Sequence, residues 1–367
     1  MFVAAAIFAA ACVLLAVLKN SSFVCENVFA KGISKAWVYV FGNVSSLFPF
    51  SLYDLFITVT IVFVAINLFV LIKSAKKRHF NRLLKALSSL VLYATCFVFI
   101  YNFTAGMNYY REQVDLPFYE GEALSESELR EVIVYFNDDF TEICEKADYE
   151  DGKIVMPYTD EELYKILEKE YEKLPSYYSE FFVAPKKTIF SPVFSATGIS
   201  GLTFLPTGET MLNAQNMQCS SVVAAAHETA HLKGVMREND AVLTAVYVLI
   251  SSGNEYFRYC GYMYYLPQMY NLYYSLYGTD DALPPFPEKA WKERQKEAAF
   301  WAEKESFVTD IGSFFNDLYI KLNGGGGTSD YSDPNLGHID SDGNPVAVYN
   351  KTQRLFLSVY FSKNLSL

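Results

Sequence analysis

The chain has 367 residues, of which 51% are hydrophobic, and a formal net charge of −11. That hydrophobic share is high for a wholly water-soluble protein and predicts that part of the chain lies in a membrane. Residues 1–103 carry nine Lys and Arg and two acids, a net of +7, so residues 104–367 must carry −18. A region this acidic excludes nucleic acid as a partner, because binding phosphate needs clustered basic side chains.

Three apolar stretches near the N-terminus are long enough, or nearly so, to cross a bilayer core of roughly 30 Å. The first has no basic residue before it, whereas a cleavable signal peptide normally has one, so we expect it to be retained. The sequence therefore predicts a membrane domain over residues 1–103 and an extramembrane domain over residues 104–367. The predicted transmembrane helices cover about residues 2–18, 55–72 and 83–103.

Basic residues in the connections between these stretches predict the orientation, because Lys and Arg near span ends are retained on the cytoplasmic side. The short second connection is richer in them than the longer first connection. We therefore expect a cytoplasmic N-terminus and an outer location for everything after about Thr104. The second connection has Lys73, Lys76, Lys77, Arg78, Arg82 and Lys85, and the first has Lys19, Lys31 and Lys35.

The sequence predicts that the extramembrane part is an α+β domain that is mostly helical. Residues 190–215 are rich in Gly, Thr, Ser and β-branched or aromatic side chains around a turn at Pro206 to Glu209, which predicts a hairpin. After it, Ser220 or Ser221 can cap a helix that Gly234 ends. The expected helices cover about residues 125–148, 160–173, 222–233, 239–251 and 288–322.

The strongest functional signal is the segment His227-Glu228-Thr229-Ala230-His231, an HExxH motif. Two histidines four residues apart lie on one helix face and can direct ring nitrogens at one zinc ion. Glu228 can accept a proton from a water that the zinc polarises. Small uncharged neighbours such as Ala230 argue against two surface histidines on an ordinary helix. We therefore predict a Zn²⁺-dependent metalloendopeptidase with His227 and His231 as ligands and Glu228 as general base.

A catalytic zinc usually has three protein ligands and one open position, so a third ligand is required. Arg237 stands where the metzincin pattern has a histidine, which implies a carboxylate instead. We favour Glu238, whose long side chain at the start of the next helix can reach back, with Asp240 as the alternative. Both acids would also favour a helix N-terminus without any metal. His338 and Tyr349 are the predicted donors to the oxyanion.

Six motifs together resemble the domain of unknown function 3810 family, bacterial three-span membrane proteins with a gluzincin-like site, and the resemblance extends over most of the chain. It implies a zincin-like (gluzincin) metallopeptidase domain with a small sheet before the HExxH helix, outside a bacterial cytoplasmic membrane. The motifs are Phe48-Pro49-Phe50-Ser51 with Asp54, Asn108-Tyr109-Tyr110-Arg111, Gly198-Ile199-Ser200-Gly201, the HExxH segment, Arg237-Glu238-Asn239-Asp240-Ala241, and Phe257-Arg258-Tyr259-Cys260-Gly261-Tyr262.

The chain departs from this family's usual Glu-x-Glu-Ala-Asn pattern after the motif helix. Glu238 falls on the first acid, Asp240 on the second and Val242 on the Asn. If that Asn orients a ligand histidine, Val242 cannot do so, which leaves the orienting hydrogen bond unassigned. In gluzincins generally, a strand before the motif helix binds substrate as an added β-strand. The segment Thr210 to Gln215 resembles that edge strand.

Three other functions compete with a peptidase that acts on peptide or protein substrates. A catalytically silent zinc-binding sensor or interaction module would not need Glu228, and a structural zinc normally has a fourth ligand. A purely structural membrane protein would not need the HExxH segment with a following Glu. An intramembrane protease would place the motif inside a span, whereas residues 237–240 are polar and the next helix is too short to cross alone.

Overall fold

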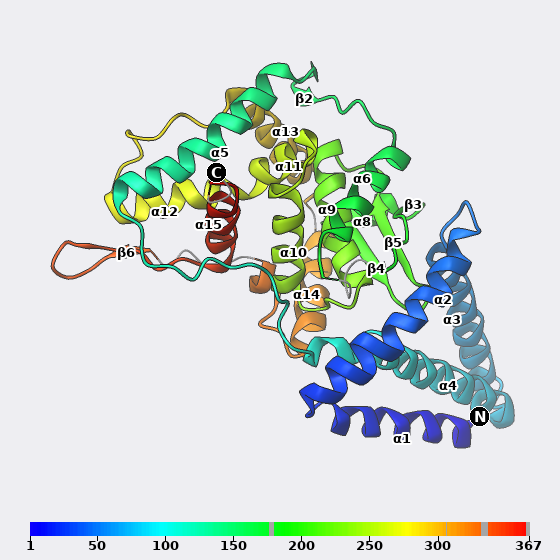
Figure 1. The fold of residues 1–367 in the computed structure, drawn as a ribbon. Helices are drawn as coiled ribbons and strands as arrows, with labels where there is room; N and C mark the ends of the chain where they lie inside the picture. Colours follow the sequence, from blue (N-terminus) through cyan, green and yellow to red (C-terminus); the bar gives the residue numbers. More distant parts are fainter. Residues whose placement is uncertain (176–179, 306, 332–336, 365–367) are drawn as a thin grey trace.

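A computed structural model of the chain describes residues 1–175, 180–305, 307–331 and 337–364. A group of apolar N-terminal helices joins a larger, mainly helical body that contains a small central sheet (Figure 1). The expectation of an α+β fold that is mostly helical is confirmed.

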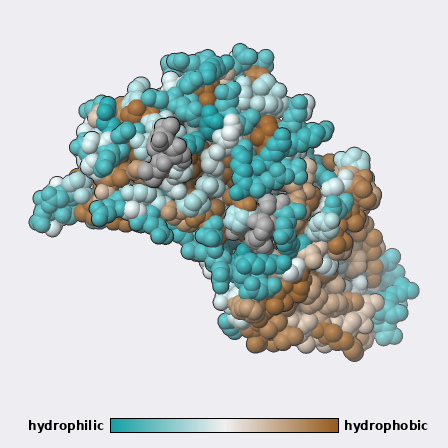
Figure 2. Space-filling view, viewed as in Figure 1, coloured by the Kyte–Doolittle hydropathy of each residue, from teal (hydrophilic) through white to brown (hydrophobic). Residues whose placement is uncertain are grey.

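Apolar surface gathers over the N-terminal helices, whereas the body is covered mainly by hydrophilic residues (Figure 2). Among the described residues, two helices are long and apolar enough to cross a membrane, α3 (Leu52–Lys76) and α4 (Phe80–Thr104). Each has 25 residues, or roughly 37 Å at 1.5 Å per residue. Helix α1 (Phe2–Leu18) is apolar but shorter, and it packs along α4. A third span therefore stays a prediction.

The connection between α1 and α3 is helical and packs against the body. It contains the π-helical segment η1 (Val24–Ser34) and α2 (Lys35–Ser46). The indole of Trp37 donates to the Pro206 carbonyl at 3.2 Å. Gly42 and Gly208 meet so closely that a Cβ on Gly208 would lie 2.5 Å from the Gly42 nitrogen. The turn after β4 is thus held directly against the N-terminal segment.

The predicted hairpin is confirmed by the antiparallel strands β4 (Gly201–Phe204) and β5 (Glu209–Asn213). The strand β3 (Lys186–Thr188) pairs parallel with β5, so the order is β3-β5-β4. The expectation that Thr210 to Gln215 forms an edge strand is therefore wrong, because β5 is central and β4 is the edge. The sequence did not reveal this because β3 covers the other side of β5, and the three residues of β3, Lys-Lys-Thr, lack the apolar alternation that predicts a strand.

Helix α9 (Gln218–Leu232) carries the HExxH segment and packs on β4 and β5. It begins earlier than expected, after Met217, and Ser220 lies inside it with its hydroxyl bonded to Glu297. Gly234, with φ of 84°, ends the helix as predicted, because only glycine adopts this left-handed conformation cheaply. The turn leads directly into α10 (Glu238–Ile250), which packs beside α9.

The remaining helices surround this centre, with a core rich in edge-packed rings such as Phe136, Phe140 and Tyr262. The long helix expected over residues 288–322 is two helices, because the backbone becomes extended at Glu305. The elements are η2 (Gly106–Tyr110), α5 (Glu126–Lys146), β1 (Tyr149–Glu150), β2 (Lys153–Ile154), α6 (Asp160–Glu172), α8 (Ser191–Ala196), α11 (Glu255–Tyr265), α12 (Pro267–Tyr277), α13 (Glu288–Lys304), α14 (Phe307–Leu322), η3 (Thr328–Tyr331), β6 (His338–Ile339), β7 (Pro345–Val346) and α15 (Lys351–Asn364).

Buried polar contacts fix the sheet to the start of α3. The Glu209 carboxylate, at the start of β5, accepts from the backbone N–H of Leu52 at 3.0 Å and from the Lys186 ammonium at 2.9 Å. The Asp54 carboxylate in the first turn of α3 accepts from the Thr188 hydroxyl at 2.6 Å. The start of β5 and the end of β3 are therefore both bonded to the first turn of α3. These bonds fix the position of the sheet relative to that helix.

Candidate metal centre

Three metal-capable side chains meet where α9 and α10 pack together. His227 and His231 come from one face of α9, and Glu238 is the first residue of α10. The Glu238 Oε2 atom lies 3.2 Å from the His227 Nε2 atom and 3.3 Å from the His231 Nε2 atom. A tetrahedral zinc with bonds of about 2.0–2.2 Å keeps neighbouring ligand atoms roughly 3.3–3.5 Å apart. The donor types and both spacings therefore fit zinc.

The backbone after α9 fixes the orientation of one of these rings. His231 Nδ1 lies 2.7 Å from the Val235 carbonyl oxygen, so Nδ1–H donates and Nε2 is left facing the cluster. The left-handed turn at Gly234 brings this carbonyl back under the ring. His231 therefore needs no hydrogen-bond partner at the position of Val242, because a backbone carbonyl supplies the orienting hydrogen bond.

The charges at the cluster favour a cation. Burial raises the pKa of the Glu238 carboxyl, but the two imidazoles, His231 foremost, outweigh this and hold it well below its usual range. Burial lowers the pKa of His231, but the Glu238 carboxylate outweighs it and raises that pKa to about 9. Glu238 is thus a buried anion that needs a positive partner, either a protonated imidazole or a metal ion.

The alternative third ligand, Asp240, is directed elsewhere. Its Oδ2 atom lies 2.7 Å from both Nε and Nη2 of Arg237, three residues earlier. The structure therefore brings Glu238 to the two histidines and pairs Asp240 with Arg237.

Glu228 lies buried beside the edge strand. The Thr203 hydroxyl on β4 lies 2.8 Å from both the Oε2 atom and the backbone oxygen of Glu228. A Cβ on Gly201, at the start of β4, would lie 2.7 Å from the Glu228 Cγ atom. Gly201 therefore allows the strand to approach the predicted general base closely, and Thr203 orients its carboxylate.

Tyr331, the last residue of η3, lies close to the cluster. Its ring centroid lies 6.2 Å from that of His227, and its hydroxyl accepts from the Asn316 amide at 3.3 Å. Its side chain is 42% exposed, but partial desolvation and then the nearby Glu238 charge raise the pKa of this phenol above its ordinary value. The phenol therefore stays protonated and can donate a hydrogen bond. Sequence reasoning missed it because the chain has 28 tyrosines and no spacing distinguishes this one.

The structure does not bring the two predicted oxyanion donors to the cluster. His338 belongs to β6, an exposed strand beside α12 in a hairpin that projects far from α9 (Figure 1). Tyr349 is buried near the start of α5, where its hydroxyl accepts from the Leu124 N–H at 2.6 Å and its ring packs against Tyr119. After η3 the chain returns to the α5 and α12 side of the body, which separates both residues from α9.

A buried arginine links the N-terminal segment to the turn after the metal helix. The Nε and Nη2 atoms of Arg111 donate to the two Glu26 carboxylate oxygens, each at 2.9 Å, and Nη1 donates to the Gly234 carbonyl at 3.3 Å. Arg111 is only 6% exposed. Arg111 therefore connects the turn that orients His231 to Glu26 of η1.

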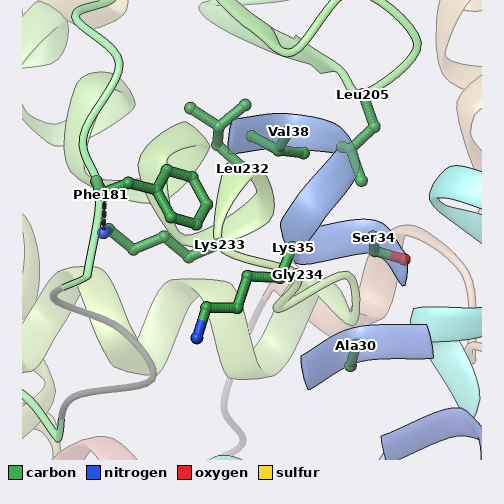
Figure 3. Close-up of a pocket in the computed structure, with 9 residues that line it drawn as sticks. All are labelled: Ala30, Ser34, Lys35, Val38, Phe181, Leu205, Leu232, Lys233 and Gly234. Carbon is green, nitrogen blue, oxygen red and sulfur yellow. Dashed lines mark hydrogen bonds between the residues drawn. The ribbon is translucent and has the colours of Figure 1, made fainter. Parts of the chain in front are cut away.

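The end of α9 also packs directly on η1 and α2 (Figure 3). The Lys233 ammonium donates to the Phe181 carbonyl and lies over the Phe181 ring, and burial lowers the pKa of this lysine to about 8. The cavity left between these parts measures about 10 Å³, which holds roughly one water. It is too small for a peptide, so this side of α9 serves packing.

The fold and the site define a mainly helical α+β protein with two long apolar helices and a buried His-His-Glu group beside an edge strand. Residues 29–334 match the model of the family described as a protein of unknown function (DUF3810). The chain belongs to that family. Comparisons with curated proteins and with solved structures gave no match.

Proposed function

We propose that the chain is a membrane-anchored, gluzincin-like zinc metalloendopeptidase. The observation that carries this proposal is the meeting of His227, His231 and Glu238 with Glu228 beside an edge strand. A structural zinc site would close with a fourth protein ligand and has no use for an adjacent carboxylate held towards a strand edge. In the described part of the chain, the group has three members.

The residues divide the chemistry between them. His227, His231 and Glu238 would hold zinc, which supplies Lewis acidity and lowers the pKa of a water that it binds. Glu228 accepts the proton of the attacking water and passes it to the leaving amine. Thr203 positions the Glu228 carboxylate for both transfers.

The edge strand supplies a place for the substrate backbone. In the described residues β4 pairs with β5 on one side, so its other edge is open to an added strand. A peptide paired there lies beside Thr203 and therefore beside Glu228. This arrangement supports a zincin-like site built on β4 in place of β5.

Tyr331 takes the role first considered for His338 and Tyr349. Its protonated phenol lies beside the cluster, where it can donate to the oxygen of the carbonyl under attack. Such a donor acts on charge that develops in the transition state, so its loss lowers kcat more than it changes KM.

The membrane topology belongs to the same proposal, with three spans in a bacterial cytoplasmic membrane, a cytoplasmic N-terminus and an extracytoplasmic body. Met1 contacts Ser88, so the N-terminus lies at the same end of the helices as the basic α3–α4 connection. The body joins the opposite ends, through Leu52 of α3 and Tyr101 of α4. Basic residues at one end and the body at the other are what the positive-inside rule requires.

The test is hydrolysis of a mixed-sequence peptide library by the zinc-loaded full chain in detergent. Glu228→Gln should lower kcat/KM by about 10²–10⁴-fold, the usual contribution of general base catalysis. Glu170→Gln, a control acid buried to a similar extent on α6, should change it little. A Glu228→Gln variant that cleaves like wild type would exclude this mechanism. A wild-type chain that binds zinc but cuts nothing would instead favour the silent zinc-binding module.

A further inference from the structure

We propose that the substrate of this site is a polypeptide anchored in the same bilayer, cut next to the membrane surface. The inference rests on the proposed peptidase function. It follows from where the edge strand ends and from an apolar helix face beside it.

The edge strand runs from the site to the outer ends of α3 and α4. Phe204, the last residue of β4, has its ring centroid 5.2 Å from that of Phe56 in α3 and 6.4 Å from that of Phe97 in α4. Phe97 is seven residues before Thr104, the end of α4, so it lies roughly 10 Å inside that helix at 1.5 Å per residue. The Phe204 ring therefore lies among the outer turns of both helices.

The general base is adjacent to this end of β4. Thr203, which contacts Glu228, directly precedes Phe204. A strand rises about 3.3 Å per residue, so a peptide paired with β4 reaches the Phe204 level within one or two residues of Thr203. One end of any bound peptide must then meet the bilayer surface. A polypeptide that emerges from the same membrane arrives there already aligned with β4.

Helix α14 presents an apolar face that a water-soluble body would not leave open. Six side chains on it are 39–76% exposed, and at 100° per residue they fall within roughly 100° of arc. Such a face, rich in Phe and Leu, is suited to the interface between headgroups and acyl chains. The six are Phe307, Ile311, Phe314, Phe315, Leu318 and Leu322.

Both ends of α14 are hydrogen-bonded to other elements, one to the segment before β4 and one to the outer end of α4. The Thr309 hydroxyl donates to the Ala196 carbonyl at 2.9 Å, just before the loop that leads to β4. At the other end the Tyr319 hydroxyl bonds the hydroxyls of Tyr101 at 2.7 Å and Tyr109 at 3.0 Å. Tyr101 is in the last turn of α4. The helix that carries the apolar face is thus attached to the outer end of a span, and we assign the outer lipid leaflet as the partner of this face.

The experiment uses the zinc-loaded full chain in proteoliposomes and one cleavable sequence, the best from the peptide library, in three forms. The first is soluble, the second is joined to a single-span anchor by about five residues, and the third is joined to the same anchor by about thirty. Any anchor raises the local concentration, so the long-linker form controls for tethering alone. The short-linker form should be cut at least about tenfold faster than the long-linker form, because only its peptide leaves the bilayer at the height of β4.

The outcomes separate the two proposals. Equal or faster cleavage of the long-linker or soluble form would overturn the membrane-anchored substrate and leave the peptidase intact. Failure to cut any of the three would overturn the peptidase and this inference with it.

A second variant tests the lipid contact of α14. Replacing Phe315 and Leu318 by Ser should reduce the rate of cleavage of the short-linker form several-fold, because α14 loses apolar contact with the leaflet. Tyr274→Ser, a control at a 58% exposed side chain on α12, should leave that rate unchanged. An unchanged rate in the α14 variant would overturn the assigned lipid contact.

Discussion

The two walls of the candidate metal centre are built differently. On one side, α9 and α10 are largely buried and β4 is half-buried, and two of the site side chains have fixed partners: His231 has the Val235 carbonyl, and Glu228 has Thr203. On the other side, α14 and η3 bring Tyr331 to the cluster, yet Ile320 is the one buried side chain among the sixteen residues of α14. The comparison indicates one rigid wall and one loosely packed wall, which in the proposed function serve catalysis and lipid contact respectively.

The rigid wall should be most sensitive where the N-terminal segment supports it. Arg111→Met leaves the Glu26 carboxylate buried without its bidentate partner and should lower the free energy of unfolding by roughly 3 kcal/mol. This is the low end for a broken buried pair, because the half-exposed Lys31 stays 3.1 Å from Glu26. The midpoint of chemical denaturation in detergent measures it.

A matched variant shows whether burial is the cause. Arg258→Met breaks the bidentate pair with Asp139, in which both side chains are partly exposed. It should lower the free energy of unfolding by about 1 kcal/mol or less. An Arg258→Met loss equal to that of Arg111→Met would contradict the role given to the buried link.

The approach of β4 to the general base gives the next largest effect. Gly201→Ala places a methyl group 2.7 Å from the Glu228 Cγ atom, so the carboxylate or the strand must move. A displacement of this kind should lower kcat by roughly 10–100-fold, measured on the soluble peptide. Gly253→Ala, whose Cβ would meet only the Lys173 ammonium at 4.0 Å, is the control and should keep kcat. A Gly201→Ala chain with normal kcat would show that this contact does not position Glu228.

Loss of a single hydrogen bond to the same carboxylate should matter less. Thr203→Val keeps the shape of the side chain but removes the hydroxyl, and at about 1 kcal/mol per hydrogen bond kcat should fall about fivefold. Thr203→Ser restores the hydroxyl and should restore kcat. Equal kcat for the Val and Ser variants would remove Thr203 from the positioning of Glu228.

The loose wall should show the smallest change in stability. Replacing Phe314 and Leu318 by Ser, both on the exposed face of α14, should shift the free energy of unfolding by no more than about 0.5 kcal/mol per site. Ile320→Ala should cost about 2–4 kcal/mol, since that side chain is buried. Similar losses for both variants would mean that the α14 face is packed after all, and the denaturation midpoint again decides.

The side chains that the sequence analysis grouped as the structure does are close together in sequence. The HExxH spacing, the helix end at Gly234 and the reach of Glu238 all depend on contacts within eleven residues, and the structure places these side chains together. The hairpin of β4 and β5 is local in the same sense.

Contacts between distant residues account for what the sequence could not predict. Tyr331 reaches His227 across about one hundred residues, and Arg111 reaches Glu26 across 85. The three-residue strand β3 made β5 central and moved the open edge to β4. None of these contacts has a periodicity or spacing that marks it, because each depends on how whole elements pack.

The most direct test of the zinc site is the metal content of the full chain purified in detergent, compared across single variants of the two candidate acids. We expect about one zinc per chain in the wild type and in Asp240→Asn, whose side chain pairs with Arg237. Glu238→Ala should lose the zinc at the same free concentration, because a ligand is removed. No zinc in the remetallated wild type, or zinc kept by Glu238→Ala and lost by Asp240→Asn, would contradict the assignment of His227, His231 and Glu238.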